Sequence, residues 1–224
     1  PGPSPVFGPH CRAFDIPNNA SIAKINFFAY GTLRYGVRPS AGDIDGDGYE
    51  EILTGAGPGV VFGPHVRGFN YDNATLTAIA KVSFFAYSTL KYGVNVAGGY
   101  LDNDTAYAEL ATGPGPGAQF GPQARGFNYD ATATSSISGL NMFAFPNGQH
   151  GANVACADVD DSATTPGREE VVVGRGPDAT IGLSEATAVG IGNVRVTAIF
   201  TAFPTYYGCV VGSGDTDAQG AAEI

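Results

Sequence analysis

The first acidic segment of the chain has the residue types and spacing of a loop that binds a metal ion. In residues 43–51, carboxylates stand at the first, third, fifth and ninth positions, with glycines between them. Because alternate residues of a tight loop point inward, these carboxylates can converge on one ion. Calcium takes about six to eight oxygen ligands in flexible geometry. The segment therefore predicts a Ca²⁺ site formed by Asp43, Asp45, Asp47, the backbone carbonyl of Tyr49, and Glu51.

Three later segments hold weaker copies of this pattern. In the second copy Gly99 stands where the first aspartate is expected, and the third copy is stretched by an insertion. Aspartate and asparagine can also cap turns through bonds to the backbone, which is the alternative interpretation. Four copies at one phase of a repeat favour metal binding. The ligands expected in these copies are Asp102, Asp104 and Glu109; Asp158, Asp160, Asp161 and Glu170; and Asp215, Asp217, Gln219 and Glu223.

Other metals and another calcium motif fit the first segment less well. Zn²⁺ prefers His or Cys ligands, and Mg²⁺ demands a stricter octahedral geometry. An EF-hand would need glutamate at the twelfth position, where this chain has Thr54, and a helix on each side. The flanking residues are Gly-rich and strand-like, which excludes an EF-hand.

No set of residues predicts catalysis. His10 and His65 recur at one position of a repeat, but the third copy has Gln123 there, and no nucleophile repeats with them. We expect these histidines to form structural hydrogen bonds beside a turn. Since no acid–base pair or nucleophile set stands out, we do not expect an enzyme, and a lyase or hydrolase on this scaffold is the least favoured function.

The acidic segments are positioned by an internal repeat of about 57 residues. The block Phe-Gly-Pro-His at residues 7–10 returns at 62–65 and, with Gln in place of His, at 120–123. An aromatic block at residues 27–30 returns at 84–87, 142–145 and 200–203. The repeats cover approximately residues 1–55, 56–113, 114–175 and 176–224 of a single domain.

Each repeat predicts four short β-strands. The segments between turns show no helical period, and Gly-Pro clusters such as residues 113–117 turn the chain. Four-stranded units at this period are typical of a β-propeller, whose blades are four-stranded antiparallel sheets. We therefore expect an all-β propeller of about four blades. The alternative is a β-sandwich with accidental similarity between its parts.

The two ends of the chain predict that one blade is shared. The N-terminal segment supplies the last two strands of a blade, and the C-terminal segment supplies the first two, ending at Glu223 and Ile224. The termini can close a ring, a neighbouring molecule can complete the blade, or the chain can be an excerpt from a longer array. Because a half-blade has open edges, head-to-tail completion would give a fibre.

The composition favours a folded protein that binds neither nucleic acid nor membranes. Hydrophobic residues make up 43% of the chain, and the net charge is −10. Nucleic acids and anionic lipids attract clustered Lys and Arg instead. No apolar run reaches the roughly 18 residues of a membrane span. Cys11, Cys156 and Cys209 lack metal-type spacing, so we expect buried thiols, with one disulfide as the alternative.

Three sequons predict N-glycosylation at Asn19, Asn73 and Asn103. Asn19 and Asn73 fall at nearly one position of the repeat, in a turn that we expect to be exposed. Asn103 lies inside the second acidic segment, where a glycan would compete with the ion.

Residues 43–59 together with residues 62–69 resemble the FG-GAP/VCBS repeat family, which is similar to the calcium-loop blades of integrin α-subunit propellers. The resemblance covers nearly the whole chain and weakens at residues 177–193, where the Phe-Gly-Pro-His block is absent. It implies a propeller with Ca²⁺ in the loop between the first two strands of a blade. It also implies an extracellular or cell-surface protein used in adhesion, carbohydrate binding or assembly. Seven blades are common in the family, and four would be a departure.

The sequence therefore favours an extracellular calcium-binding propeller that serves adhesion or structural assembly, with a head-to-tail fibre as one form. Its partners would be further copies of the chain, or a ligand or glycan at a cell surface. A lectin-like propeller is the alternative function. The rings that would stack on sugars are Tyr30, Tyr35, Tyr87 and Tyr92.

Overall fold

The regular structure of the described residues consists of β-strands. The computed structural model describes residues 1–31, 34–89, 91–160, 167–217 and 220–224, and all assigned elements within these ranges are strands. The described part of the chain contains no helix of the length and apolarity needed to cross a membrane. The expected all-β fold class is confirmed.

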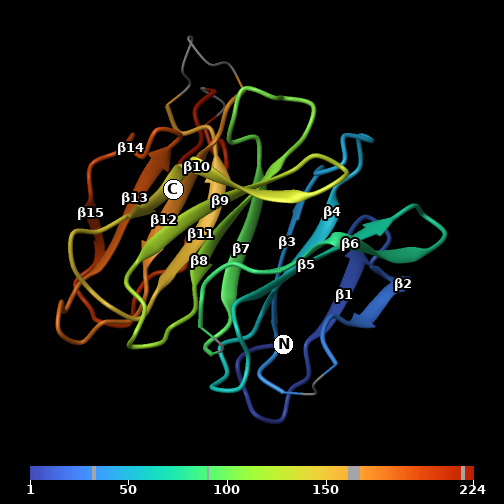
Figure 1. Cartoon of the computed structure of the whole chain (residues 1–224), viewed down its shortest axis with the longest axis horizontal. Coiled ribbons are helices and arrows are strands. Elements are labelled where there is room, and N and C mark those ends of the chain that lie inside the picture. Colours follow the sequence, from blue (N-terminus) through green and yellow to red (C-terminus); the bar gives the residue numbers. More distant parts are fainter. Residues whose placement is uncertain (32–33, 90, 161–166, 218–219) are drawn as a thin grey trace.

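The strands form four antiparallel sheets that follow one another along the chain (Figure 1). Sheet 1 pairs β1 (His10–Asp15) with β2 (Ala20–Phe28). Sheet 2 contains β3 (Val37–Gly42), β4 (Glu51–Ala56), β5 (His65–Tyr71) and β6 (Leu76–Phe85). Sheet 3 contains β7 (Val94–Gly99), β8 (Glu109–Pro114), β9 (Gln123–Tyr129) and β10 (Thr134–Phe143). Sheet 4 contains β11 (Ala152–Ala157), β12 (Glu170–Arg175), β13 (Ser184–Gly190), β14 (Val194–Arg195) and β15 (Phe200–Phe203).

Sheets 2 and 3 are the four-stranded antiparallel units that the repeat predicted. Their strands pair in chain order, β3-β4-β5-β6 and β7-β8-β9-β10. Each sheet takes its first two strands from one predicted repeat and its last two from the next, so sheet 2 spans the boundary after residue 55. Sheet 1 holds only strands of the last two kinds.

The hairpins between the last two strands of sheets 2 and 3 are closed by an aspartate. Asp72 accepts hydrogen bonds from the backbone N–H groups of Ala74 and Thr75 at 2.8 and 2.6 Å. Asp130 forms the equivalent bonds in sheet 3. Asn73, which lies between Asp72 and Ala74, has a φ of 64°. Asparagine tolerates this left-handed conformation better than most residues do. The sequence thus determines these turns locally.

The first strands of sheets 2, 3 and 4 lie side by side in the middle of the molecule (Figure 1). The backbones approach closely because glycines stand at the crossings. A Cβ on Gly98 of β7 would lie 2.4 Å from the carbonyl oxygen of Ala41 on β3. A Cβ on Gly113 of β8, the second strand of sheet 3, would lie 2.4 Å from the carbonyl oxygen of Ala152 on β11. These distances are too short for any side chain, so the glycines allow the sheets to stack.

One set of contacts joins sheet 1 to sheet 2. The rings of Phe27 and Phe69 pack with their centroids 4.6 Å apart. The Arg67 guanidinium donates a hydrogen bond to the carbonyl of Ala29. The Tyr30 hydroxyl contacts a carbonyl of β4 at 2.9 Å and one of β5 at 2.8 Å. We call this combination the inter-sheet contact.

The inter-sheet contact is repeated between sheets 2 and 3. Phe84 and Phe127 pack at a centroid distance of 4.6 Å, and Arg125 donates to the carbonyl of Ala86. The Tyr87 hydroxyl contacts carbonyls of β8 and β9 at 3.0 and 3.1 Å. Aromatic packing together with bonds from buried polar groups fixes the orientation of each sheet on the next.

The contact between sheets 3 and 4 uses a buried arginine instead. Phe145 replaces the tyrosine, and the Arg175 guanidinium lies 4.4 Å from its ring centroid. Arg175 is only 1% exposed, forms an ion pair with Glu185, and donates to the carbonyl of Asn147 at 2.7 Å. Because a buried charge is costly unless it is paired, this set of partners explains how Arg175 is accommodated.

The chain after β15 continues the series of first strands. The backbone N–H of Cys209 donates to the carbonyl of Arg175 at 3.0 Å, and the Asn153 side chain donates to the carbonyl of Cys209 at 2.6 Å. Farther on, Gly214 and Glu223 form an isolated antiparallel bridge. Residues 209–217 and 220–224 therefore pack beside sheet 4, whereas sheet 1 lies at the opposite end of the molecule (Figure 1).

The three cysteines are free thiols. Cys11 and Cys209 are buried, as expected, and Cys156 is half-buried. Burial raises the pKa of the Cys11 thiol to about 11, so this group stays protonated at neutral pH. The alternative of a disulfide is not realised.

We expect Tyr87→Phe to destabilise the protein by about 1 kcal/mol, because a net hydrogen bond of a buried hydroxyl contributes about that much. Urea unfolding at neutral pH measures the change. Tyr49→Phe is the control, since the Tyr49 side chain is 63% exposed. Equal stability of both variants would contradict the structural role of the Tyr87 hydroxyl.

Candidate metal centre

Loop 1, residues 43–50, joins β3 to β4 and is organised by its first aspartate. The two carboxylate oxygens of Asp43 accept hydrogen bonds from the backbone N–H groups of Gly46, Asp47 and Gly48 at 2.8, 3.1 and 3.0 Å. Gly46 and Gly48 have φ values of 74° and 88°, which favour glycine. The loop is therefore a tight turn wrapped around one carboxylate.

Loop 1 brings three carboxylates together. Asp43, Asp45 and Glu51 each offer an oxygen, and these oxygens lie within 4.8 Å of one another. One carboxylate oxygen of Asp45 accepts a hydrogen bond from the Asn70 amide at 3.1 Å, whereas the other is buried and has no hydrogen-bond partner. Within the described residues, the one ion pair is that of Arg175, far along the chain. Close carboxylates with an unsatisfied buried oxygen fit a bound cation, and an all-oxygen set suits Ca²⁺.

Asp47 and Tyr49 lie outside this group of three. Asp47 is exposed and accepts a hydrogen bond from the backbone N–H of Tyr49 at 2.8 Å. Ligation by Asp47 and by the Tyr49 carbonyl stays a prediction.

The third copy forms a similar group. Oxygens of Asp158, Asp160 and Glu170 lie within 4.8 Å of one another, and one oxygen of Glu170 is buried without a hydrogen-bond partner. This copy therefore passes the same test as loop 1. Asp161, the fourth ligand expected here, lies outside the described residues.

The fourth copy gathers Asp215, Asp217 and Glu223, all three exposed. Glu223 accepts hydrogen bonds from the backbone N–H and the hydroxyl of Thr216 at 2.7 and 2.6 Å, which lower its pKa. This site is thus more open than the other two. Gln219 lies outside the described residues.

The second copy differs because a tyrosine replaces the first aspartate. Gly42 pairs with Glu51 in sheet 2, and Gly99 pairs with Glu109 in sheet 3, so Tyr100 occupies the position of Asp43. The sequence alignment that put Gly99 there was wrong by one residue. Among the described residues, Asp102, Asp104 and Glu109 form no group of close oxygens like those of the other copies.

A buried glutamate begins the second strand of sheets 2, 3 and 4. Glu51, Glu109 and Glu170 are 1%, 0% and 1% exposed, and each accepts a hydrogen bond from a backbone N–H of its own loop at 2.9, 2.7 and 3.2 Å. Burial raises the pKa of each carboxyl to about 7, and neighbouring aspartates add to the effect. Without a cation, the ionised form of each of these carboxyls is therefore energetically unfavourable.

A chain of backbone bonds links each loop to the next sheet. The N–H of Ala108 donates to the carbonyl of Asp43 at 2.7 Å, and the N–H of Glu169 donates to that of Tyr100 at 2.6 Å. The N–H of Ala222 donates to the carbonyl of Asp158 at 2.6 Å. Each donor directly precedes the glutamate of the next copy. Sequence reasoning missed these links, because backbone groups leave no trace in residue types.

The three sequon asparagines are exposed. Asn19 and Asn73 lie in the hairpin turns of sheets 1 and 2 with φ values of 49° and 64°. Asn103 lies in loop 2, residues 100–108, which joins β7 to β8. The exposure of the turns is confirmed, and glycosylation stays a prediction.

The tyrosines considered for sugar stacking are used inside the protein. Tyr30 and Tyr87 form the inter-sheet contacts, and Tyr87 is only 6% exposed. Tyr35 and Tyr92 are half-buried against phenylalanine rings at centroid distances of 5.8 and 6.4 Å. These rings do not form an exposed platform, so this part of the lectin interpretation is wrong.

The histidines form hydrogen bonds across the outer hairpins. His10 contacts the Asn26 side chain at 2.5 Å, and His65 contacts Ser83 at 3.0 Å. Gln123 donates to Asn141 at 2.7 Å in the same place. The expected structural role of this position is confirmed.

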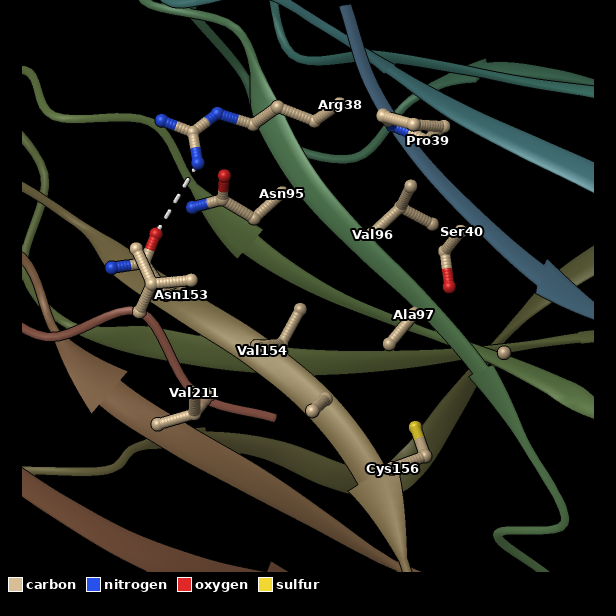
Figure 2. Close-up of a pocket in the computed structure, with 13 residues that line it drawn as sticks. Arg38, Pro39, Ser40, Asn95, Val96, Ala97, Asn153, Val154, Cys156 and Val211 are labelled. Carbon is tan, nitrogen blue, oxygen red and sulfur yellow. Dashed lines mark hydrogen bonds between the residues drawn. The ribbon is translucent and has the colours of Figure 1, made fainter. Parts of the chain in front are cut away.

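A pocket of about 360 Å³ lies along the first strands of sheets 2, 3 and 4. In Figure 2, Arg38 on β3 and Asn153 on β11 point toward one another and are joined by a hydrogen bond of 3.3 Å, with Asn95 on β7 beside them. The pocket is lined mostly by small and apolar side chains below this polar rim. Its lining residues belong to the strands and to residues 210 and 211, and they include none of the loop carboxylates.

Comparison with known families supports the resemblance seen in the sequence. Residues 35–73 match the family model described as FG-GAP repeat. The match begins just before β3, contains loop 1 and β4, and ends after β5. A comparison with curated proteins finds no match. Residues 35–73 are thus similar to an FG-GAP repeat, and the matched segment includes the group of Asp43, Asp45 and Glu51.

Without added metal, we expect stability to fall as pH rises from about 4.5 to 7. The unfolded glutamates ionise near pH 4.5, whereas the buried ones hold their protons up to about pH 7, so the folded state binds more protons in this window. Glu109→Gln removes one of these titrating carboxyls, so the free energy of unfolding of the variant should fall less steeply between pH 4.5 and 7. Urea unfolding of both proteins at several pH values measures it, and a stability difference that stays constant with pH would contradict the prediction.

Proposed function

We propose that this chain is a calcium-binding β-propeller module that works outside the cell in adhesion or structural assembly. The observation that carries the proposal is the group of Asp43, Asp45 and Glu51, with its buried, unsatisfied carboxylate oxygen, inside the matched FG-GAP repeat. Stacked four-stranded sheets with adjacent first strands support the propeller.

In this proposal calcium has a structural task. Asp43, Asp45 and Glu51 would hold one ion, and Asp158, Asp160 and Glu170 a second. The ion neutralises carboxylates that are otherwise costly to bury, and it fixes the loop between the first two strands. Because each loop is hydrogen-bonded to the next sheet, the ion also stabilises the packing between sheets.

An extracellular location agrees with this role. Extracellular calcium modules bind the ion with dissociation constants of about 10⁻⁴ to 10⁻³ M, so an open loop is sufficient there. FG-GAP repeats are in general binding modules without catalytic activity. We therefore propose binding, to further copies of the chain or to a cell-surface ligand, as the activity of the protein.

The melting temperature should rise with calcium and fall on addition of EDTA. Saturation at about 100 times the dissociation constant stabilises a protein by about 2.7 kcal/mol per site, which corresponds to roughly 5–10 °C for a chain of this size. Calorimetric titration of Asp45→Asn should show one site fewer than wild type, because this change removes a carboxylate from the group of three.

Asp72→Asn is the matched control, since Asp72 also accepts hydrogen bonds from backbone N–H groups but belongs to none of the groups of close carboxylates among the described residues. This variant should keep the wild-type number of sites. An identical melting temperature in calcium and in EDTA would refute the metal proposal.

A further inference from the structure

Two adjoining pockets lie along the first strands of sheets 2, 3 and 4. The larger holds about 360 Å³ and the smaller about 190 Å³, and both are lined by Arg38, Asn95 and Asn153. These are the second residues of β3, β7 and β11, and each pairs with a glycine of the next strand. They therefore occupy one position of the repeat and gather at one hollow (Figure 2).

Arg38 departs from the pattern that the two asparagines follow. The Asn95 side-chain amide donates to the carbonyl of Ala152, and that of Asn153 donates to the carbonyl of Cys209 at 2.6 Å. Because a carbonyl only accepts, these bonds determine which atom of each amide is the oxygen. The longer Arg38 side chain instead extends past β7 and donates to Oδ1 of Asn153 at 3.3 Å (Figure 2).

The Arg38 guanidinium carries a positive charge without a carboxylate beside it. The one ion pair among the described residues joins Arg175 to Glu185, and no described carboxylate lines either pocket. Burial lowers the pKa of Arg38, the direction expected for a cation without an acidic neighbour. A guanidinium has five N–H donors in a fork that suits a carboxylate, so most of its hydrogen-bonding capacity is open to an anion.

Asn95 presents an unused acceptor in the same hollow. The residue is only 6% exposed, and its Oδ1 is buried without a hydrogen-bond partner. A buried acceptor without a partner costs free energy, which a ligand group that donates a hydrogen bond there would recover. The hollow therefore suits a ligand that has a donor as well as a negative charge.

A histidine is the second departure from the repeat at this place. His150 stands where the other copies have a tyrosine, namely Tyr35, Tyr92 and Tyr207. It lines the smaller pocket together with Arg38, and its Nδ1 is buried without a hydrogen-bond partner. Because an imidazole N–H can donate to an anion, the smaller pocket has two donor groups for a negatively charged head group.

The larger pocket continues from the polar groups between apolar walls. Its lining includes Val96 and Ala97 on β7, Val154 on β11, and Val211 (Figure 2). Such walls suit an apolar tail. A sugar acid would place hydroxyl groups against them without partners, and inorganic phosphate would leave them uncovered.

We propose that this hollow binds a small 2-hydroxy acid with an apolar side chain. The carboxylate would accept hydrogen bonds from Arg38 and His150, and the hydroxyl would donate to Oδ1 of Asn95. The apolar side chain would lie against Val96 and Val154. An amino acid fits less well, because its ammonium group would add a second positive charge near Arg38 with no acid to balance it.

The site is separate from the metal groups and from the sheets at the two ends of the molecule. None of its residues belongs to a group of close carboxylates. Arg38 and Asn95 lie on sheets 2 and 3, each of which packs between two other sheets. A failure of calcium binding would therefore leave this proposal standing, and the reverse also holds.

Calorimetric titration of the full chain with leucic acid, the 2-hydroxy acid that corresponds to leucine, tests the proposal. Salt of about 0.15 M screens the repulsion from the net charge of −10 beyond about 8 Å. We expect saturable binding at one site. Isocaproic acid, which lacks the hydroxyl, leucine, and the amide of leucic acid, which lacks the charge, should each bind at least threefold more weakly.

Arg38→Asn is the main variant, because it introduces the residue that the second and third copies have at this position. It should weaken the binding of leucic acid at least tenfold. Arg38→Lys keeps the charge and should retain more of the affinity, and His150→Tyr, which restores the residue of the other copies, should weaken binding as well. Lys24→Gln, an equal change of charge at an exposed residue of β2, is the control and should bind like wild type.

Circular dichroism and thermal melting establish that each variant is folded. No binding of leucic acid to wild type at about 10 mM, equal binding of its amide, or wild-type affinity in Arg38→Asn would each overturn the proposal. Equal weakening by Lys24→Gln would also overturn it, since the effect of Arg38 would then come from net charge alone.

Discussion

Glu51, Glu109 and Glu170 each bury a carboxylate where the second strand of a sheet begins. The position is unfavourable for an ionised group, and burial raises each pKa to about 7. Each carboxylate holds a backbone N–H of the preceding loop, so the shape of the loop depends on it. A cation between the glutamate and the aspartates of loop 1 would turn this cost into a stabilising interaction.

The order of the sheets depends on the same region and on the contacts at the other end of the strands. Backbone bonds connect loop 1 to the residue before Glu109, and loop 2 to the residue before Glu170. The inter-sheet contacts of Tyr30 and Tyr87 hold the sheets together elsewhere. The repeat therefore combines an acidic loop with a contact between neighbouring sheets.

Much of the fold could be predicted from the sequence, because the same pattern of strands and turns recurs in each repeat. The strands, the capped hairpins and the position of loop 1 follow from local turn chemistry and recurring aromatics. The role of Tyr87 could not be predicted, since an exposed ring and a buried one that donates to a carbonyl look alike in sequence. Tyr100 was not recognised as the equivalent of Asp43, although Asp102 and Asp104 follow Asp45 and Asp47 at the same spacing. The pairing of Gly99 with Glu109 shows the equivalence directly.

The metal groups could be predicted only in part. Asp43, Asp45 and Glu51 come together as their spacing indicated, whereas the partner of Asp45, Asn70, comes from β5 and belongs to no loop motif. A crystal structure of the protein grown with calcium tests the central claim most directly. We expect an ion bonded to carboxylate oxygens of Asp43, Asp45 and Glu51 at about 2.3–2.6 Å. A water molecule in that place, with Glu51 bound only to the protein, would contradict the account.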